Sequence, residues 1–302
     1  MTQSAHRKHN TVGFVGLGVM GSRMIRNIKG YADLLVFDVD TARAEEAASA
    51  AGGKAVKGLA ELAGADVVVL MLPSSTIVDE VVRGGPKGKG LLDLLSSGAT
   101  IIDMSSATPA NTIENARQAK AKGISYLDAP VSGGPSGAAA GTLAIMVGGS
   151  VEDFEHARPL LERMGTNVIL AGETGSGHAV KALNNLLGAV VLAASSEIFA
   201  AGEKFGLDPS VMHKIVNASS GGSFMTNVTW PRAILPKTYD FGFTLQLMNK
   251  DVGIAMSLIE STGVQTRLAK LGAEMWGETM KDAPAGVDMT EITRRIMKEA
   301  GL

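Results

Sequence analysis

Two groups of residues in this sequence have the types and the spacing to do chemistry. The first is a glycine-rich run that begins at Gly16, and the second is a lysine–asparagine pair, Lys181 and Asn185. Residues four apart lie on one face of a helix, so the pair points the same way if its segment is helical. Such a pair is compatible with a solvated helix face and with a site for a polar ligand. The rest of the chain decides between the two.

The glycine run lies between a short apolar segment, TVGFV, and a helix-like segment, SRMIRNIKG. Its glycines have the spacing G-x-G-x-x-G, and the run consists of Gly16, Leu17, Gly18, Val19, Met20 and Gly21. In this motif the first glycine allows a tight turn, the second lets a pyrophosphate approach the backbone, and the third lets helix and strand pack closely. Asp38 ends the next strand-like run, 22 residues after Gly16, where a ribose-binding acid is expected. The context predicts a dinucleotide site.

Asp38 favours NAD as the cofactor. A carboxylate accepts hydrogen bonds from the ribose hydroxyls of NAD and repels the 2′-phosphate of NADP, by up to about 4 kcal/mol for unit charges about 4 Å apart at an effective dielectric near 20. Arg43, in the helix-like segment that follows, would allow some use of NADP. The alternative is that Asp38 or Asp40 only caps that helix.

Strand-like and helix-like runs alternate from Thr11 to about residue 172, which predicts an α/β fold with a doubly wound, mostly parallel sheet. After the first two strands we expect strands within 66–72, 100–106, 125–134, 143–149 and 167–172, and helices at 75–83, 108–123 and 151–163. The segment GGPKGKG is expected to be a solvated connection. Ligands of such sheets bind beyond the carboxyl ends of the strands. The residues to watch are therefore Leu72, Pro73, Ser105, Ser106 and 131–134.

A long helix over 178–206, roughly 40 Å at the helical rise, opens the second half of the chain. Shorter helices are expected near 209–216, 245–261, 266–277 and 290–300, with loops at 218–224 and 227–239. No strand alternation remains, so this half is predicted to be a smaller, all-helical domain. We expect a flexible tail at 1–10, a dinucleotide-binding domain at 11–174, and a helical substrate and oligomerisation domain at 175–302.

Composition excludes several classes of function. The 302 residues carry a net charge of −2 and no basic run, so neither a nucleic-acid partner nor a membrane partner is expected. Apolar runs such as Val67–Leu72 have the length of strands and are too short to cross a bilayer. There is no cysteine, and the five histidines lack metal-ligand spacing, so we expect no metal site and place the histidines at the surface or at caps. A cytoplasmic enzyme or binding protein is expected.

Four ordered motifs resemble the β-hydroxyacid dehydrogenase family, which includes 3-hydroxyisobutyrate dehydrogenase and tartronate semialdehyde (2-hydroxy-3-oxopropionate) reductase. They are FVGLGVMGSRMIRNI, DAPVSGG, GSGHAVKALNN and LMNKD, and the resemblance covers nearly the whole chain after the tail. It implies a Rossmann domain and a helical domain with substrate and nicotinamide held between them. It also implies hydride transfer between NAD(P) and a small β-hydroxy acid or its semialdehyde.

The resemblance assigns roles to residues of this sequence. Lys181 matches the lysine that acts as general acid and base, and Asn185 matches a residue that binds the substrate or holds the lysine in line. The residues that match substrate contacts are Ser132, Gly133 and Gly134, which would bind the carboxylate, and Phe243. Outside the glycine run and Asp38, those that match cofactor contacts are Leu72, Pro73, Ser106, Lys250 and Asp251.

Several alternatives stay open at this point. 6-Phosphogluconate dehydrogenase has a far larger helical domain, and imine reductases lack this lysine, so neither fits as well. A catalytically silent NAD-binding module is the main alternative to an enzyme. Ile77 stands where some family members place an asparagine, and the segment 227–239 matches neither named subfamily, so the substrate is not assigned. The small residues along the long helix favour close packing between subunits, so we expect a homodimer or a homotetramer.

Overall fold

The computed structural model describes residues 9–86 and 88–302. The chain divides into two compact units, Met1–Lys181 and Ala182–Leu302. The domain boundary expected from the sequence lies between 174 and 175, a few residues before this division, and it stays a proposal. Of the expected tail, residues 1–8 lie outside the described part of the chain. His9 is already buried, and the Asn10 N–H donates to Asp66 at 2.8 Å.

The first unit is built on a nine-stranded sheet, counted over the described residues. Its strands are β1 (Thr11–Val15), β2 (Asp33–Phe37), β3 (Lys54–Ala55), β4 (Val67–Leu70), β7 (Thr100–Asp103), β8 (Ser125–Asp128), β9 (Val131–Ser132), β10 (Leu143–Gly148) and β11 (Gly165–Gly172). The order is β11-β10-β8-β7-β4-β1-β2-β3, with β9 paired to β10. The six strands from β8 to β3 are parallel, whereas β10 is antiparallel to β8. This confirms the predicted mostly parallel sheet.

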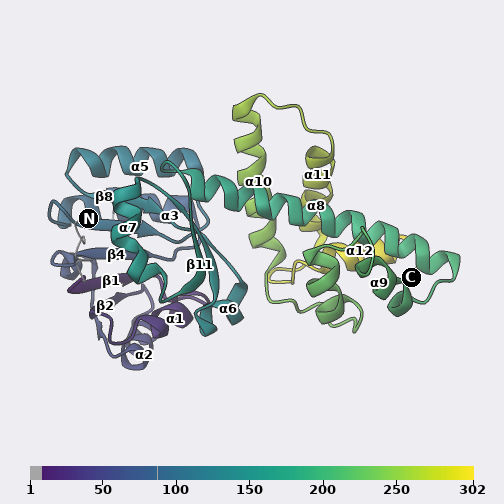
Figure 1. Ribbon diagram of the computed structural model, residues 1–302, viewed down its shortest axis with the longest axis horizontal. Coiled ribbons are helices and arrows are strands. Elements are labelled where there is room, and N and C mark those ends of the chain that lie inside the picture. The colour runs from purple at the N-terminus through teal and green to yellow at the C-terminus, as the bar shows by residue number, and fades with distance from the viewer. Residues whose placement is uncertain (1–8, 87) are drawn as a thin grey trace, which may run out of the picture. The chain divides into compact units, whose positions relative to one another are not determined.

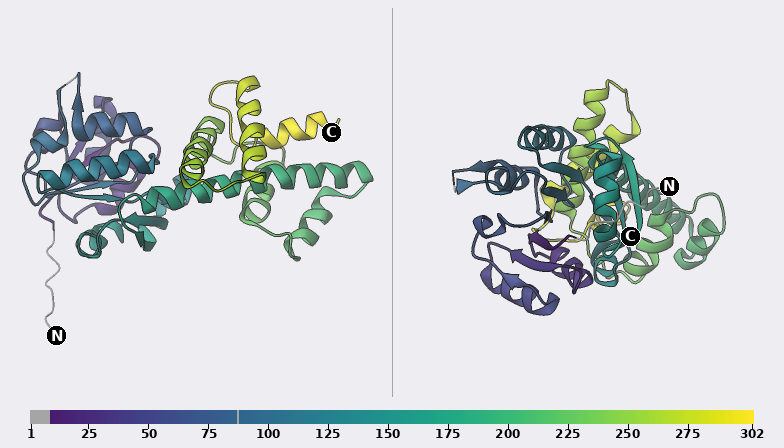
Figure 2. Two further views of the ribbon diagram at one scale, coloured as in Figure 1. Left: turned by 90° about the horizontal axis from the view of Figure 1, so that it is seen from above. Right: turned by 60° about the vertical axis from the view of Figure 1, so that its left-hand side comes forward.

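Helices cover both faces of the sheet (Figures 1 and 2). The helices are α1 (Gly21–Met24), which continues as a 3₁₀-helix (Ile25–Ile28), α2 (Thr41–Ala51), α3 (Ser75–Arg83), α4 (Leu91–Leu94), α5 (Pro109–Ala121), α6 (Gly134–Ala140) and α7 (Val151–Leu161). Met24, Ala47 and Leu160 belong to one buried cluster, so α1, α2 and α7 share a face. Val78 and Ala119 belong to the other cluster, which places α3 and α5 on the opposite face.

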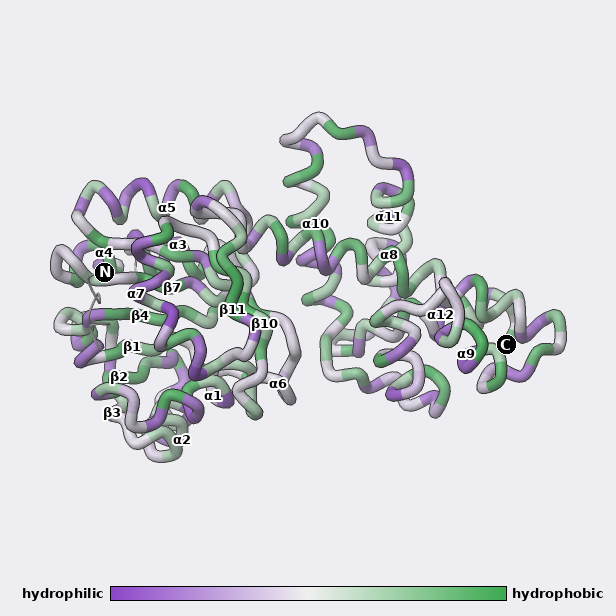
Figure 3. Tube along the Cα trace, in the orientation of Figure 1, coloured by the Kyte–Doolittle hydropathy of each residue, from purple (hydrophilic) through white to green (hydrophobic). Residues whose placement is uncertain are grey.

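The central strands have the sequence that such a position requires. Every residue of β4 is 0% exposed, because a parallel strand covered on both faces buries both sets of side chains. Figure 3 shows the matching hydrophobic colour along β1 and β4. The expected connection GGPKGKG contains a small hairpin of β5 (Gly84–Gly85) and β6 (Gly88–Lys89), and a 3₁₀-helix forms at Leu59–Leu62.

Helix α8 (Ser176–Phe205) is 30 residues long and is the predicted long helix. By its length and its mean hydropathy of 1.5, this helix could also cross a membrane. This is not expected from the continuous apolar runs of the sequence, which are only as long as strands. The most apolar window is, however, 44% buried within the fold. Ala182, Leu186, Ala189 and Leu192 belong to the core of the second unit, so packing within the protein accounts for part of the apolar character of the helix.

The second unit contains helices and no strand within its residues, all of which are described. Around α8 lie α9 (Pro209–Asn217), a π-helix (Met225–Ile234), α10 (Leu245–Thr262), α11 (Leu268–Asp282) and α12 (Glu291–Glu299). Trp230 and Trp276 are the largest buried side chains of its core, and the Trp276 indole N–H donates to the Ala189 carbonyl at 3.1 Å. The Asn185–Asp251 hydrogen bond places α10 beside the first half of α8, and the Ser196–Thr293 hydrogen bond places α12 beside its second half (Figure 1).

The expectation of a loop at 227–239 is wrong, because most of that segment belongs to the π-helix. Pro231 has no N–H and its ring crowds the preceding turn, which made a helix unlikely from the sequence. The segment winds with a wider turn: the Leu235 N–H donates to the Trp230 carbonyl, five residues back, at 2.9 Å. Burial of Trp230 at 1% exposure and Ala233 at 0% stabilises this arrangement.

Candidate active site

The glycine run forms the turn from β1 into α1. Gly16 has φ +94°, and a Cβ there would lie 2.3 Å from the Met71 carbonyl oxygen. A Cβ on Gly21 would lie 2.0 Å from the Gly16 carbonyl oxygen. Only glycine fits these two positions. A Cβ on Gly18 would meet no atom within 4 Å, so the fold itself does not require this glycine, and the space beside it is open to a ligand.

The side chains of the run point in different directions. Leu17 is fully buried, Val19 is 62% exposed, and Met20 is partly buried. The Ser22 hydroxyl donates to the Gly18 carbonyl at 2.8 Å, and the Arg23 guanidinium donates to the Val19 carbonyl at 2.5 Å. These bonds hold the run against the first turn of α1.

Asp38 lies behind the glycine run and is 8% exposed. It accepts the Leu17 N–H at 2.7 Å and the Asp40 N–H at 2.9 Å, and the Arg43 guanidinium lies 3.7 Å from it. Asp40, rather than Asp38, caps α2 by accepting the Arg43 N–H at 3.1 Å. The capping role that the sequence left open therefore belongs to Asp40, and the Asp38 carboxylate ties the loop to the end of β2.

A second group of predicted cofactor residues follows β4 and β7, which are parallel neighbours and so end at the same edge of the sheet. Leu72 and Ser106 are partly buried, and Pro73 is exposed. The Leu72 N–H donates to the Ser105 hydroxyl at 3.0 Å, which joins the two strand ends. The structure thus brings Leu72 and Ser106 onto adjacent strand ends, as expected.

The predicted carboxylate loop, Ser132 to Gly134, forms the turn from β9 into α6. Gly133 has φ +131° and is the N-cap of α6, and Gly134 has φ +61°. Both glycines are exposed, and Ser132 is partly buried. Consecutive glycines with positive φ leave the backbone of this turn open to an approaching anion.

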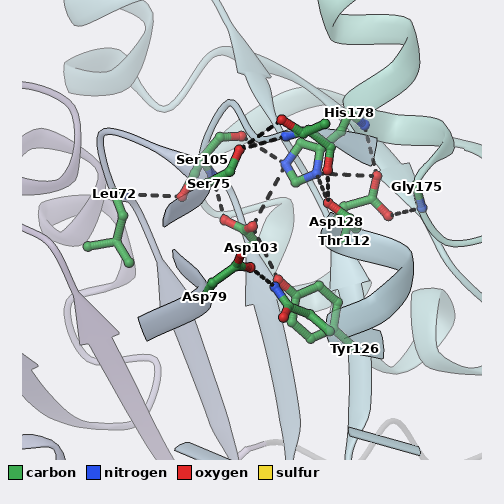
Figure 4. A network of polar contacts seen from close by, with 12 residues as sticks. Leu72, Ser75, Asp79, Asp103, Ser105, Thr112, Tyr126, Asp128, Gly175 and His178 are labelled. Atoms are coloured by element: carbon green, nitrogen blue, oxygen red, sulfur yellow. Dashed lines mark hydrogen bonds and ion pairs between the residues drawn. The ribbon is translucent and has the colours of Figure 1, made fainter. Parts of the chain in front are cut away.

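Lys181 is partly buried and lies in the second turn of α8. The start of α8 is fixed by the side chain of Asp128, at the end of β8. Asp128 accepts the Gly175 N–H at 2.7 Å and the His178 N–H at 2.8 Å (Figure 4). A carboxylate that binds the free N–H groups of a first turn anchors the helix and favours its dipole. Lys181 is therefore carried by a turn that is bonded directly to the sheet.

Three predicted residues of the second unit lie together. The Asn185 amide donates to the Asp251 carboxylate at 2.6 Å, and the Lys250 ammonium lies 3.2 Å from the same carboxylate. Asp251 is 3% exposed, so both interactions are largely shielded from water. Phe243 is partly buried in the core of this unit, and its backbone N–H donates to Asp288 at 3.1 Å.

Comparison with known proteins gives two family matches. Residues 11–172 match the NAD binding domain of 6-phosphogluconate dehydrogenase, and residues 175–296 match the model described as NAD-binding of NADP-dependent 3-hydroxyisobutyrate dehydrogenase. The chain is 36% identical over 293 residues to 3-hydroxyisobutyrate dehydrogenase of Pseudomonas aeruginosa, which covers 94% of this chain and 97% of that protein. It is 38% identical over 267 residues to 2-(hydroxymethyl)glutarate dehydrogenase of Eubacterium barkeri, with 88% and 87% covered. The chain belongs to the β-hydroxyacid dehydrogenase family.

A solved structure agrees with this assignment. The 3-hydroxyisobutyrate dehydrogenase of Mycobacterium tuberculosis with L-serine matches the fold with a TM-score of 0.87 at 32% identity, and the match covers 95% of this chain and 99% of that one. The family resemblance read from the four motifs is confirmed. This β-hydroxyacid dehydrogenase is an NAD(P)-dependent enzyme acting on CH–OH groups, and residues 11–172 form its NAD-binding domain.

The residues of this dehydrogenase fit the cofactor. The open space beside Gly18 would take the pyrophosphate, and Asp38 stands at the strand end where the adenosine ribose binds in such folds. Among residues 9–86 and 88–302, no group of three or more histidine, cysteine or acidic side chains could hold a metal ion.

The sequence interpretation missed one group of residues in this dehydrogenase. His178 was expected at the surface or at a cap, but it is 1% exposed, and its ring lies between Ser105 and Thr112 (Figure 4). Asp103 and Asp128 are both 0% exposed beside it. The available signals were the position of His178, three residues before Lys181, and the presence of Asp128 within DAPVSGG.

Proposed function

We propose that this enzyme interconverts a small 3-hydroxy acid and its semialdehyde, with NAD as the preferred cofactor and Lys181 as the general acid and base. One observation carries the proposal. Lys181 is the last residue of the compact unit that also contains the glycine run, Asp38, Leu72 and Ser106. Its helix is bonded to β8 through Asp128, so the lysine and the cofactor-binding strand ends belong to one body.

Each residue has a defined task in this proposal. A bound NAD would supply the acceptor for the hydride that leaves the carbon of the alcohol. Lys181, as the free amine, takes the hydroxyl proton as that C–H bond breaks, and in the reverse direction its ammonium returns the proton to the aldehyde oxygen. Ser132, Gly133 and Gly134 bind the carboxylate. Asn185 and Phe243 bind the rest of the substrate, and Lys250 and Asp251 reach the cofactor.

The chemistry shared by the relatives narrows the substrate class. 3-Hydroxyisobutyrate and 2-(hydroxymethyl)glutarate, and the L-serine bound to the solved structure, all carry a CH₂OH group on the carbon that bears a carboxylate. They differ only in the other substituent of that carbon, which is methyl, carboxyethyl or ammonium. We therefore propose a 2-substituted 3-hydroxypropanoate as the substrate, with 3-hydroxyisobutyrate or glycerate as the first choice.

A panel assay tests this function. The pure protein is given NAD or NADP with 3-hydroxypropionate, 3-hydroxyisobutyrate, glycerate, L-serine and 2-(hydroxymethyl)glutarate, and nucleotide reduction is followed. Lactate and 3-hydroxybutyrate serve as controls, because their alcohols are secondary. Turnover of at least one primary alcohol, and preference for NAD, would support the proposal. Turnover of lactate alone would contradict it, and tight NAD binding without any turnover would favour a silent binding module.

We also propose that the enzyme is a homodimer or homotetramer that uses the exposed face of α9. The helix has no buried residue in the single chain, although Val211 and Ile215 lie on one side of it and are 52% and 60% exposed. Ile198 and Phe205 of α8 are 62% and 85% exposed. Met212 and Val216 of this helix pack against the core of the second unit, so the side that carries Val211 and Ile215 is available to a second copy. A cytoplasmic location is a further part of this proposal.

A further inference from the structure

The ring of His178 joins two parts of the first unit. Its Nε2 lies 3.0 Å from the Ser105 carbonyl oxygen, and its Nδ1 lies 2.7 Å from the Thr112 hydroxyl (Figure 4). A carbonyl oxygen only accepts, so Nε2 carries a proton and donates to Ser105. With the backbone bond to Asp128, the residue is therefore held at three atoms.

The two buried carboxylates beside the ring are already engaged by other groups. Asp103 accepts the Ser105 N–H at 3.0 Å and the Tyr126 hydroxyl at 3.2 Å. Burial, and next the charge of Asp103, raise the pKa of Tyr126 well above its ordinary value, so the phenol keeps its proton and donates. Asp128 is engaged by the backbone at the start of α8. The carboxylates lie 4.0 and 3.9 Å from the imidazole nitrogens, so the ring orients toward Ser105 and Thr112 instead.

Ser105 is fixed at every polar atom. Its N–H donates to Asp103, its hydroxyl accepts from the Leu72 N–H, and its carbonyl accepts from His178. The Ser105 carbonyl and the Ser106 N–H belong to one planar peptide group. The hydrogen bond from His178 therefore sets the direction of the Ser106 N–H, at the strand end where the nicotinamide is proposed to bind.

We propose that His178 is a positioning residue for hydride transfer, because it locks the Ser105–Ser106 peptide to the turn of α8 that carries Lys181. This inference rests on the proposed role of Lys181. His178 is 1% exposed and bonded to Ser105, Thr112 and Asp128, so in this proposal it acts through these residues. Loss of His178 leaves each binding group in place but lets Lys181 and the Ser105–Ser106 peptide move relative to one another. Misplacement of reacting groups by about 1 Å can cost on the order of 100-fold in rate.

Three substitutions of His178 separate positioning from simple loss of packing. Gln places an amide N–H near the position of Nε2 and keeps the donor to Ser105. Asn places its amide near Nδ1 and loses that donor, and Ala loses both. His213→Ala is the matched control, because the Nε2 of His213 lies 2.8 Å from the Thr226 carbonyl in the second unit and removal breaks the same type of bond elsewhere.

The full-length variants are compared by kcat, KM, the NAD dissociation constant and the primary deuterium isotope effect with substrate deuterated at the CH₂OH carbon. We expect His178→Asn and His178→Ala to lower kcat by about 10- to 100-fold, with KM and NAD affinity within about threefold and a larger isotope effect. His178→Gln should recover most of kcat, and His213→Ala should keep it. Equal loss in the Gln and Asn variants would overturn the inference, as would an unchanged kcat in both. If His178→Ala does not fold, the Gln and Asn pair still decides.

A second measurement does not depend on turnover. The ¹⁵N order parameter of the Ser106 amide should fall in His178→Asn and return in His178→Gln. If wild-type protein turns over no acid of the panel, the proposed function fails. The order parameters still test whether His178 holds the Ser105–Ser106 peptide in place. An order parameter at Ser106 that is the same in all variants would overturn the inference, even in an active enzyme.

Discussion

The side-chain amide of Asn185 donates a 2.6 Å hydrogen bond to the carboxylate of Asp251. A carboxylate only accepts, so the amide nitrogen must face Asp251, and the Asn185 carbonyl oxygen faces the other way. The Lys250 ammonium, 3.2 Å from Asp251, balances the buried negative charge. The three residues thus act as a unit in which Asp251 orients Asn185.

Removal of either partner should therefore have the same effect. We expect Asn185→Ala and Asp251→Ala each to lower kcat/KM by about 10- to 100-fold, since a hydrogen bond to a charged group contributes about 1.5–3 kcal/mol. The double variant should be little worse than either single variant, and a double-mutant cycle measures the coupling. Additive losses would show that Asn185 and Asp251 act independently.

Asp38 should set the choice of cofactor. Asp38→Asn keeps an acceptor for the Leu17 N–H but removes the negative charge, so we expect weaker binding of NAD and tighter binding of NADP. The ratio of kcat/KM with NADP to kcat/KM with NAD should rise by about 10-fold or more. The variant loses the charged hydrogen bond to the NAD ribose and also the repulsion of the NADP 2′-phosphate, and both losses favour NADP. Arg43→Ala, which leaves Asp38 in place, is the control and should lower use of NADP only. A variant with unchanged cofactor preference would remove Asp38 from this role.

His9 should make the stability of the fold depend on pH. Burial, and next the charge of His156, lower the pKa of His9 from 6.5 to about 4. The ring of His9 packs edge-on against His156, with ring centroids 4.5 Å apart, and Tyr31 and Asp66 are its other neighbours. Because the pKa is lower in the folded state, the unfolded chain binds more protons between these values, and the free energy of unfolding falls as the pH decreases from 6.5 to about 4.

The variant His9→Phe keeps an aromatic ring at this position and removes its titration. Chemical denaturation at several pH values should therefore show a shallower loss of stability for His9→Phe than for the wild type over that window. If the free energy of unfolding falls equally with pH in the two proteins, His9 does not contribute to the pH dependence of stability. The difference between the two curves reports His9 together with its electrostatic coupling to His156 and Asp66.

The exposed side of α9 should hold copies of the chain together. Val211→Asp and Ile215→Asp place charges on that side, where burial in an interface would cost far more than exposure to water. We expect sedimentation velocity at micromolar concentration to show a smaller species than for the wild type. Val151→Asp, at a 65% exposed position on α7, is the control and should leave the sedimentation coefficient unchanged. A monomeric wild-type protein would contradict the proposal directly.

Local patterns explain how much of the fold could be predicted. The segment Val67–Leu70 is a continuous apolar run, and Ser75–Arg83 is amphipathic with Ser74 as its cap, so both elements lie where they were expected. The π-helix around Pro231 could not be predicted, because its stability comes from the burial of Trp230 against distant residues such as Phe199, whose ring centroid lies 4.4 Å from that of Trp230. Likewise, β6 pairs with β5 through backbone atoms of three glycines and Lys89, which leave no pattern of apolar side chains.

The candidate site shows the same limit. The glycine run and Asp38 stand in a motif whose spacing predicts their roles, whereas the role of Lys181 is implied by the family resemblance. The burial of His178 depends on Asp128, 50 residues away, and on Ser105, 73 residues away. Such contacts between distant strand ends are set by the order of strands in the sheet, which no local spacing reveals. An isolated histidine therefore could not be distinguished from a surface residue before the fold was known.

Comparison of Lys181→Ala with the wild type on the best substrate of the panel tests the central claim most directly. The variant should bind NAD normally, because the lysine is not needed to hold the nucleotide. Its kcat should fall by about 10²–10⁴-fold, the usual contribution of a positioned acid–base group. Partial recovery on addition of a small primary amine would support proton transfer as the lost function. A variant with wild-type kcat would contradict the assignment of Lys181 and, with it, the proposed mechanism.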